Sequence, residues 1–71
     1  MTIVRHYLMT AAEGRAPELR KILQDLANKV RPLAGCEGVE LYQDPELETR
    51  FIFLERWTSA DAHREAGLTS S

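Results

Sequence analysis

Residues 50–57, RFIFLERW, predict a β-strand that is buried on both faces, because four apolar side chains follow one another from Phe51 to Leu54. A strand with one face in water would instead alternate apolar and polar positions. In a chain of 71 residues, the protein's own helices can cover one face of a small sheet. We therefore expect a partner to cover the other face.

Two further strands are predicted upstream of this one. Residues 39–43 form the second strand, and the polar segment 44–49 joins it to the third through a turn that Asp44-Pro45 initiates. Residues 3–9 form the first strand, because β-branched and aromatic residues alternate there, although Arg5 and His6 interrupt the pattern.

The segment from Pro17 onward predicts an amphipathic helix. Proline is tolerated in a first helical turn, and Glu18 suits the positive end of the helix dipole. The helix is expected to end near Ala34, because Pro32 weakens its last turn and Gly35 is a natural stop. Its apolar positions recur at spacings of three and four, and all are expected in the core: Leu19, Ile22, Leu23, Leu26, Ala27, Val30 and Leu33.

A short second helix is predicted directly after the third strand. Thr58 or Ser59 can cap it, and Asp61 adds a favourable charge to its first turn. The helix holds residues 62–66 and meets Gly67, and residues 68–71 are expected as a tail.

The predicted order is therefore strand, helix, strand, strand, helix. A helix that crosses between two strands of one sheet makes them parallel, while the second and third strands form an antiparallel hairpin. This order predicts one α+β domain over residues 1–71, a ferredoxin-like β-α-β-β-α sandwich whose final strand is missing.

Composition narrows the possible partners. The net charge is −2, with 9 basic and 11 acidic residues interspersed, and this argues against nucleic acid as a partner. The N-terminus shows no apolar run long enough for a signal peptide or a membrane span. Cys36 is the only cysteine, so it has no disulfide partner within the chain, and it is expected to pack rather than act as a nucleophile. Neither Cys nor His occurs at metal-site spacing. These features favour the cytoplasm and stabilisation by oligomerisation.

Two short segments carry a resemblance to a known family. Gly35-Cys36 leads into the second strand, and the run Glu55-Arg56-Trp57-Thr58-Ser59 opens the second helix. In this order and spacing, over about residues 3–66, the chain resembles the antibiotic biosynthesis monooxygenases, a family of dimeric α/β barrels. The resemblance implies a homodimer paired through the sheet faces. It also implies oxygenation of electron-rich aromatics such as anthrones and quinols, without a metal or flavin cofactor.

The chain departs from the family pattern in the second helix. Family members usually carry a His a few residues after the Trp, and Ala66 takes that place here. Haem-degrading relatives use that His as the iron ligand and an Asn on the first strand, where Tyr7 stands in this chain. Haem degradation is therefore disfavoured.

Two residues of the first strand are the candidates for catalysis. His6 could deprotonate a phenol or a carbon acid if it faces the pocket, and Tyr7 could donate a hydrogen bond to a substrate oxygen. The alternative for His6, which we favour, is a half-exposed strand residue at the dimer surface. His63 is expected to be a solvent-facing helix residue, because Arg64 and Glu65 follow it.

Two aromatic residues are candidates for substrate binding. Trp57 could stack on a planar substrate, although a core position beneath the second helix is the favoured alternative. Tyr42 could donate a hydrogen bond to a substrate oxygen, but a strand tyrosine is also an ordinary β-former.

Two arginines complete the predicted binding residues. Arg5 and Arg56 could hold an oxyanion of the substrate. The commoner role is pairing across neighbouring strands, for which Glu40 and Glu55 are the available carboxylates.

Two functions from different classes remain open. The first is a cofactor-independent monooxygenase of a phenolic, quinol or polycyclic aromatic small molecule. The second is a non-catalytic small-molecule-binding or dimeric assembly module with the same fold. The missing strand and Ala66 favour the second, and the polar strand residues favour the first if they face one shared cavity.

Overall fold

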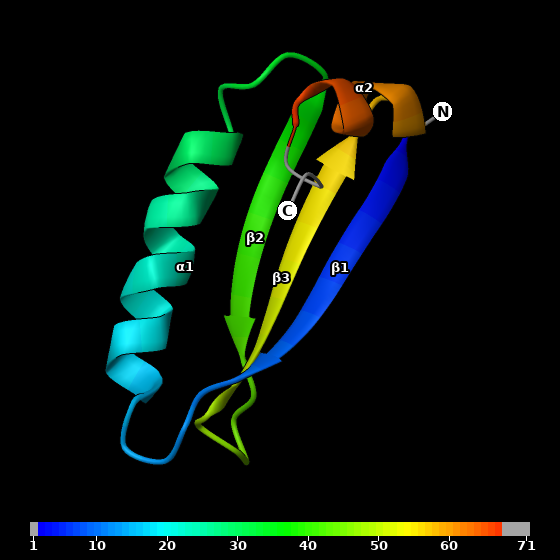
Figure 1. Cartoon of the computed structure of the whole chain (residues 1–71). Helices are drawn as coiled ribbons and strands as arrows, with labels where there is room; N and C mark the ends of the chain where they lie inside the picture. Colours follow the sequence, from blue (N-terminus) through cyan, green and yellow to red (C-terminus); the bar gives the residue numbers. More distant parts are fainter. Residues whose placement is uncertain (1, 68–71) are drawn as a thin grey trace.

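The structure, a computed structural model, describes residues 2–67 and contains two helices and three strands within them (Figure 1). In chain order these are β1 (Ile3–Thr10), α1 (Ala16–Val30), β2 (Cys36–Gln43), β3 (Arg50–Trp57) and α2 (Ala60–Glu65). The predicted tail, residues 68–71, lies outside the described residues.

Strand β3 is the centre of the sheet. The strand order is β1-β3-β2, and β3 pairs antiparallel with both neighbours. Because β1 and β2 each run opposite to β3, they are parallel to one another, as a right-handed β-α-β crossover requires. The predicted ferredoxin-like α+β fold is therefore confirmed, and the sheet has three strands within residues 2–67.

Helix α1 ends at Val30, and the prediction of an end near Ala34 was wrong. The last helical bond runs from the Arg31 N–H to the Ala27 carbonyl, at 3.0 Å. Pro32 has no N–H to continue the ladder. The Leu33 N–H instead bonds the Val30 carbonyl at 3.0 Å in a tighter turn, and Gly35, with φ of 85°, then redirects the chain into β2.

Strand β2 starts at Cys36, three residues earlier than the Val39 that the sequence indicated. Cys36 pairs with Trp57, and a bulge between Cys36 and Gly38 restores the register before Val39 pairs with Glu55. A glycine inside a strand often marks such a bulge.

The predicted cap of α2 is confirmed. The Ser59 side chain accepts a hydrogen bond from the Ala62 N–H at 3.0 Å. Asp61 lies in the first turn of the helix, as expected.

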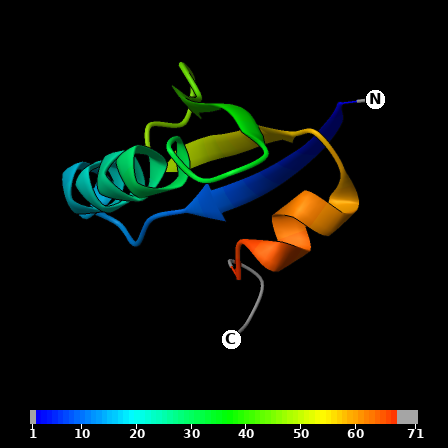
Figure 2. The same cartoon turned by 90° about the horizontal axis from the view of Figure 1, so that it is seen from above.

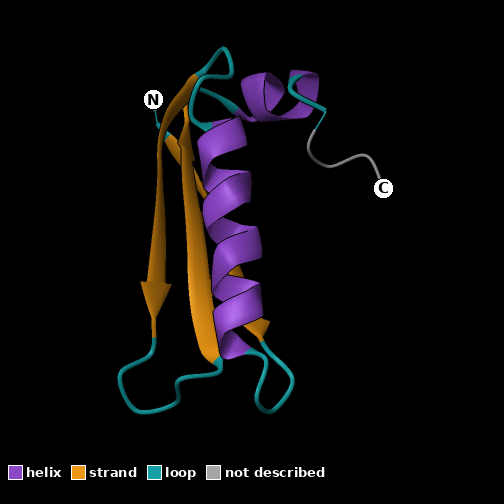
Figure 3. Cartoon of the chain, turned by 90° about the vertical axis from the view of Figure 1, so that its left-hand side faces the viewer, coloured by secondary structure: helices purple, strands orange, loops and turns teal. Residues whose placement is uncertain are grey.

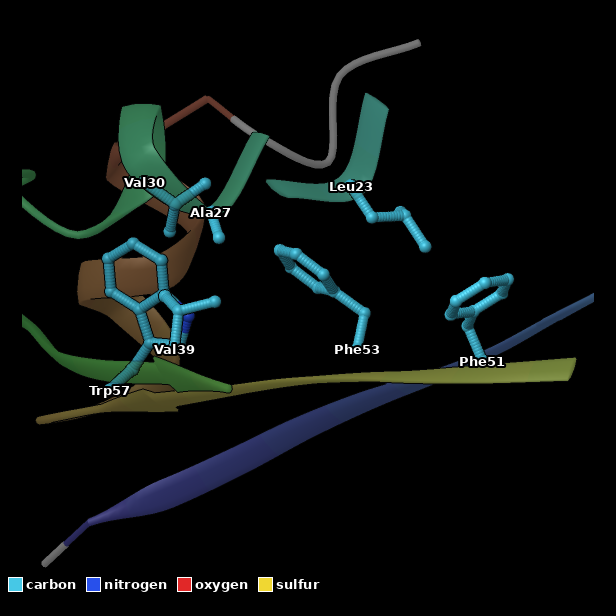
Figure 4. Packing of buried hydrophobic residues seen from close by; sticks show 7 residues of the cluster. All are labelled: Leu23, Ala27, Val30, Val39, Phe51, Phe53 and Trp57. Atoms are coloured by element: carbon cyan, nitrogen blue, oxygen red, sulfur yellow. The ribbon is translucent and has the colours of Figure 1, made fainter. Parts of the chain in front are cut away.

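Both helices lie on the same side of the sheet, with α1 running along it and α2 across one end (Figures 2 and 3). The β3 side chains that point to this inner face are all buried. Cys36 packs against the core as a partly buried residue, as expected. Figure 4 shows how α1 and the sheet contribute to one core, whose fully or nearly fully buried members are Leu23, Ala27, Val30, Val39, Phe51, Phe53 and Trp57.

The outer face of the sheet is uncovered within the described chain. Its exposed apolar side chains come from all three strands: Val4, Leu8, Tyr42 and Ile52. The apolar run of β3 predicted such a second face, and the structure identifies its residues.

One apolar residue of α1 that was expected in the core is exposed instead. Ile22 is 62% exposed rather than part of the core. Helix α1 packs chiefly against β2 and β3. Ile22 instead lines an open hollow together with Thr10 and Ala11, where β1 ends.

Candidate functional site

The off-centre position of α1 leaves a cavity over the β1 side of the inner face. The cavity has a volume of ≈ 210 Å³. Five side chains from three elements line it: Tyr7, Met9, Leu26, Phe53 and Glu55. The walls are mostly apolar, with one phenol and one carboxylate among them.

Two of the larger hollows are open and lack buried polar groups. One, of ≈ 450 Å³, lies between α1 and β2 and is lined by exposed polar side chains, including Gln24, Asp25 and Arg31. The other, of ≈ 550 Å³, lies between the loop after α1 and α2, and its one charged lining residue, Glu65, is exposed. The ≈ 210 Å³ cavity is the candidate site because its lining includes a buried ionisable group.

Tyr7 reaches the cavity from β1. It lies on the inner face, directly opposite Phe53 in the strand register. The two rings are tilted by 52°, with their centroids 6.3 Å apart, which is within the range of a favourable aromatic pair. Tyr7 therefore places a phenolic hydroxyl beside an aromatic wall.

Glu55 is a carboxylate on the inner face of β3, among the buried aromatic side chains. It is 3% exposed, and the Trp57 indole Nε1–H donates a hydrogen bond of 3.0 Å to its Oε1. Burying a carboxylate is costly unless polar partners compensate. The sequence indicated Glu55 only as a possible partner of an arginine and gave no sign of its burial.

His63 is the second buried polar residue, and the prediction that it faces solvent was wrong. It is 3% exposed, because α2 folds back over the end of the sheet and turns this residue inward. Its Nε2 lies 3.7 Å from Glu55 Oε1 and has no hydrogen-bond partner within residues 2–67. Its ring meets Trp57 edge-on, with the centroids 5.4 Å apart.

Trp57 takes the core position that was favoured over substrate stacking. It is fully buried and packs in the core. It does not line the cavity, and it reaches the site through its hydrogen bond to Glu55.

The remaining predicted site residues do not line this cavity. His6, Tyr42 and Arg56 lie on the outer face, where His6 is opposite Leu54 and Tyr42 is opposite Ile52. Arg5 lies on the inner face opposite Glu55, with an exposed side chain. The structure thus brings Tyr7 together with Glu55, a residue that the sequence did not mark as a site residue.

Arg56 makes the cross-strand pair that was the favoured alternative to oxyanion binding. Its guanidinium donates a hydrogen bond to Glu40 on the neighbouring strand. This bond and the charge of Glu40 raise the pKa of Arg56 above its usual value. The side chain therefore stays cationic at neutral and moderately alkaline pH.

Residues 2–67 contain no group of three or more His, Cys, Asp or Glu side chains placed to hold a metal ion. No helix in these residues is long and apolar enough to cross a membrane.

Comparison with known proteins identifies the fold's relatives. A Pseudomonas aeruginosa protein is 30% identical, with a TM-score of 0.80, and the match covers 97% of this chain and 68% of that one. A Deinococcus radiodurans protein described as a putative antibiotic biosynthesis monooxygenase is 24% identical, with a TM-score of 0.85 and coverage of 99% and 68%. A heme-degrading protein from Mycobacterium tuberculosis, in a heme-free, cleaved form, is 24% identical, with a TM-score of 0.82 and coverage of 100% and 83%.

The family of the chain follows from its sequence rather than from these structures. The likeness to the Deinococcus and Mycobacterium proteins shows the fold alone, and no curated protein sequence matches the chain. The family model for antibiotic biosynthesis monooxygenase matches residues 2–67, which include every helix and strand of the structure. The chain therefore belongs to the antibiotic biosynthesis monooxygenase family.

Proposed function

We propose that this chain binds a small phenol or quinol in the cavity between α1 and the sheet and oxygenates it without a cofactor. The observation that carries the proposal is the lining of the cavity, where Tyr7 and Glu55 sit among Met9, Leu26 and Phe53. A concave, mostly apolar site with a few convergent polar groups is the usual form of a small-molecule site. Family membership supports the same reaction class.

The size of the cavity favours a substrate with one aromatic ring over a polycyclic one. Its volume is ≈ 210 Å³, whereas sites for drug-sized ligands measure roughly 300–1,000 Å³. An apolar protein cavity of about 150 Å³ is known to hold benzene. A hydroquinone-sized ring therefore fits the volume of the cavity.

The proposed reaction consumes one quinol and one O₂. The quinol loses a hydroxyl proton, and the electron-rich ring carbon of the resulting anion bonds to oxygen. The O–O bond then breaks, so that one oxygen atom stays on the ring and the other leaves as water. Hydroquinone and O₂ would give hydroxyquinone and water, and the four electrons that reduce O₂ all come from the substrate.

Some of the cavity residues would orient the substrate, and others would exclude water. The Tyr7 hydroxyl can donate a hydrogen bond to the oxyanion of the bound quinolate. Phe53 offers a ring for aromatic contact, and Leu26 and Met9 close the apolar wall. Arg5 remains a candidate for attracting the anion from the edge of the inner face.

Substitution of Tyr7 by Phe tests this proposal. The change keeps the ring and removes the hydrogen-bond donor, so we expect kcat/KM for hydroquinone to fall about 10- to 100-fold, as for a lost hydrogen bond to a charged group. Oxygen uptake measures the rate.

Tyr42→Phe provides the matched control, because it removes the same hydroxyl from the opposite face of the sheet. We expect its rate to stay within about twofold of wild type. Equal losses in both variants, or none in Tyr7→Phe, would contradict the role of the cavity.

A second candidate function rests on the outer face. Val4, Leu8, Tyr42 and Ile52 expose apolar surface that a second copy of the chain can cover, and small domains often gain stability in this way. We propose a homodimer through this face. If hydroquinone neither binds nor reacts while the dimer forms, the chain is a non-catalytic binding or assembly module.

A further inference from the structure

We propose that Glu55 is the base of the reaction and that His63 and Trp57 are positioning residues that hold its carboxylate. The inference rests on the proposed function for the identity of the substrate. The arrangement of the three side chains is a property of the structure itself.

Glu55 is placed to take a proton from a ligand in the cavity. It is the one carboxylate among the residues that line the cavity, and it lies within the sheet rather than at its rim. Trp57 engages only Oε1. The Oε2 atom therefore remains available for a proton from the ligand, and a base must lie within reach of the proton that it takes.

Two side chains, Trp57 and His63, lie near the same oxygen atom of the Glu55 carboxylate. The Trp57 Nε1–H donates to Oε1, and an indole N–H is only a donor. His63 Nε2 approaches the same oxygen to 3.7 Å. If Nε2 carried no proton, two hydrogen-bond acceptors would face each other. The position of the carboxylate therefore favours the His63 tautomer whose proton is on Nε2.

The separation of 3.7 Å is longer than a hydrogen bond. Catalytic contacts are often long without substrate and tighten in the substrate complex. In the complex, two donors on Oε1 would orient the carboxylate so that Oε2 can take the quinol proton. The proton then returns to the oxygen atom that leaves as water.

His63 is an unexpected residue for a buried helix position. The neighbouring buried groups are the Trp57 ring and the Glu55 carboxylate. A residue that only filled space there would be apolar, because burying a polar group without a partner costs free energy. The Nε2 atom is without a hydrogen bond within residues 2–67, and a donor role toward Glu55 accounts for its placement.

Variants of His63 separate a positioning role from a packing role. His63→Gln keeps a side-chain N–H donor, whereas His63→Leu replaces the ring by apolar volume. We expect His63→Leu to lower kcat for hydroquinone about tenfold or more, and His63→Gln to recover part of that loss. A pure packing role predicts the opposite order, because leucine suits an apolar site better than glutamine.

Glu55→Gln tests the base directly. The amide oxygen can still accept the Trp57 hydrogen bond, but the side chain can no longer take a proton. We expect kcat to fall about 10²- to 10⁴-fold. Glu48→Gln, on the exposed loop before β3, is the matched control and should leave kcat unchanged.

Nitrogen NMR of the wild-type protein gives a readout that does not depend on turnover. We expect His63 to carry its proton on Nε2, and its Nε2–H resonance to shift when hydroquinone is added without oxygen. His63→Gln assigns the signal.

The outcomes separate this inference from the proposed function. A proton on Nδ1 alone, or an unchanged His63 signal while the resonances of Tyr7 and Phe53 move, would overturn the roles of His63 and Glu55 and leave the proposed function intact. If hydroquinone moves none of these resonances, the proposed function fails, and the role of Glu55 as its base fails with it.

Discussion

Among the individual residues, the most consequential is a polar group buried between aromatic side chains. Glu55 lies between Phe53 and Trp57 on the inner face of β3. The Trp57 Nε1–H donates a hydrogen bond to its carboxylate, and His63 Nε2 lies 3.7 Å from the same oxygen atom. Such a group is stable only while its partners are in place, because removing one partner leaves a buried charge uncompensated.

Trp57→Phe tests this dependence. The variant loses the donor to Glu55 and leaves space in the core, so we expect the free energy of unfolding to fall by about 2–4 kcal/mol. Urea denaturation followed by circular dichroism measures the change. If the variant combined with Glu55→Gln loses as much as the sum of the two single changes, the two side chains do not act together.

The chemistry of these residues is harder to predict than their secondary structure. Tyr7 is a candidate from sequence because a strand tyrosine can face a pocket. Glu55 and His63 are not, because burial of a charged residue depends on tertiary partners that a sequence does not display. His6 and Arg56 have chemistry that suits catalysis, but the strand register places both on the outer face.

Among the helices and strands, the turn at Gly35 between α1 and β2 is in close contact with α2. Gly35 has φ of 85°, and a Cβ built on it would lie 2.6 Å from the Ala62 Cβ in α2. The position therefore needs glycine both for its backbone conformation and for the close approach of the helix. Because α2 carries His63, the contact at Gly35 also fixes the position of His63 beside Glu55.

Gly35→Ala should therefore destabilise the protein more than an ordinary change at a positive φ. Gly14 has φ of 78°, and a Cβ there would have no atom within 4 Å, so Gly14→Ala tests the backbone effect alone. We expect a loss of about 1–2 kcal/mol for Gly14→Ala and about 1–3 kcal/mol more for Gly35→Ala. Urea unfolding midpoints compare the two variants. Equal losses of stability would show that α2 can shift to accommodate the added methyl group without any loss of unfolding free energy.

Element types follow from periodicity, whereas several boundaries do not. The spacing of apolar residues identifies α1, and the apolar run of β3 identifies the central strand. The end of α1 is misplaced from sequence because Pro32 stops the hydrogen-bond ladder before the apolar stripe ends at Leu33. The inner face of β3 cannot be chosen from sequence, because both of its faces are apolar.

At the scale of the whole molecule, both helices of residues 2–67 lie on one side of the sheet. The outer face presents Val4, Leu8, Tyr42 and Ile52 to solvent. Apolar residues concentrated on one sheet face are typical of an interaction surface. The proposed homodimer would bury this face and leave the cavity, on the opposite side of the sheet, open to substrate.

Leu8→Asp tests the dimer. Leu8 is 64% exposed on the outer face. In the dimer, a charge at this position would be buried without a partner. We therefore expect the variant to be monomeric at concentrations where the wild type is dimeric. Ile22→Asp is the control, because Ile22 is 62% exposed but lies on α1. Sedimentation velocity reports the mass, and a wild-type monomer, or equal behaviour of the two variants, would contradict the proposal.

The proposed function requires that the cavity between α1 and the sheet binds a small quinol and promotes its reaction with O₂. Oxygen uptake should be measured on the protein with hydroquinone, after removal of metals and without added flavin, beside Tyr7→Phe and Tyr42→Phe. We expect one O₂ consumed per quinol, a rate lowered by Tyr7→Phe, and an unchanged rate in Tyr42→Phe. Uptake no faster than that of hydroquinone alone, or uptake that both variants leave unchanged, would refute the proposed function.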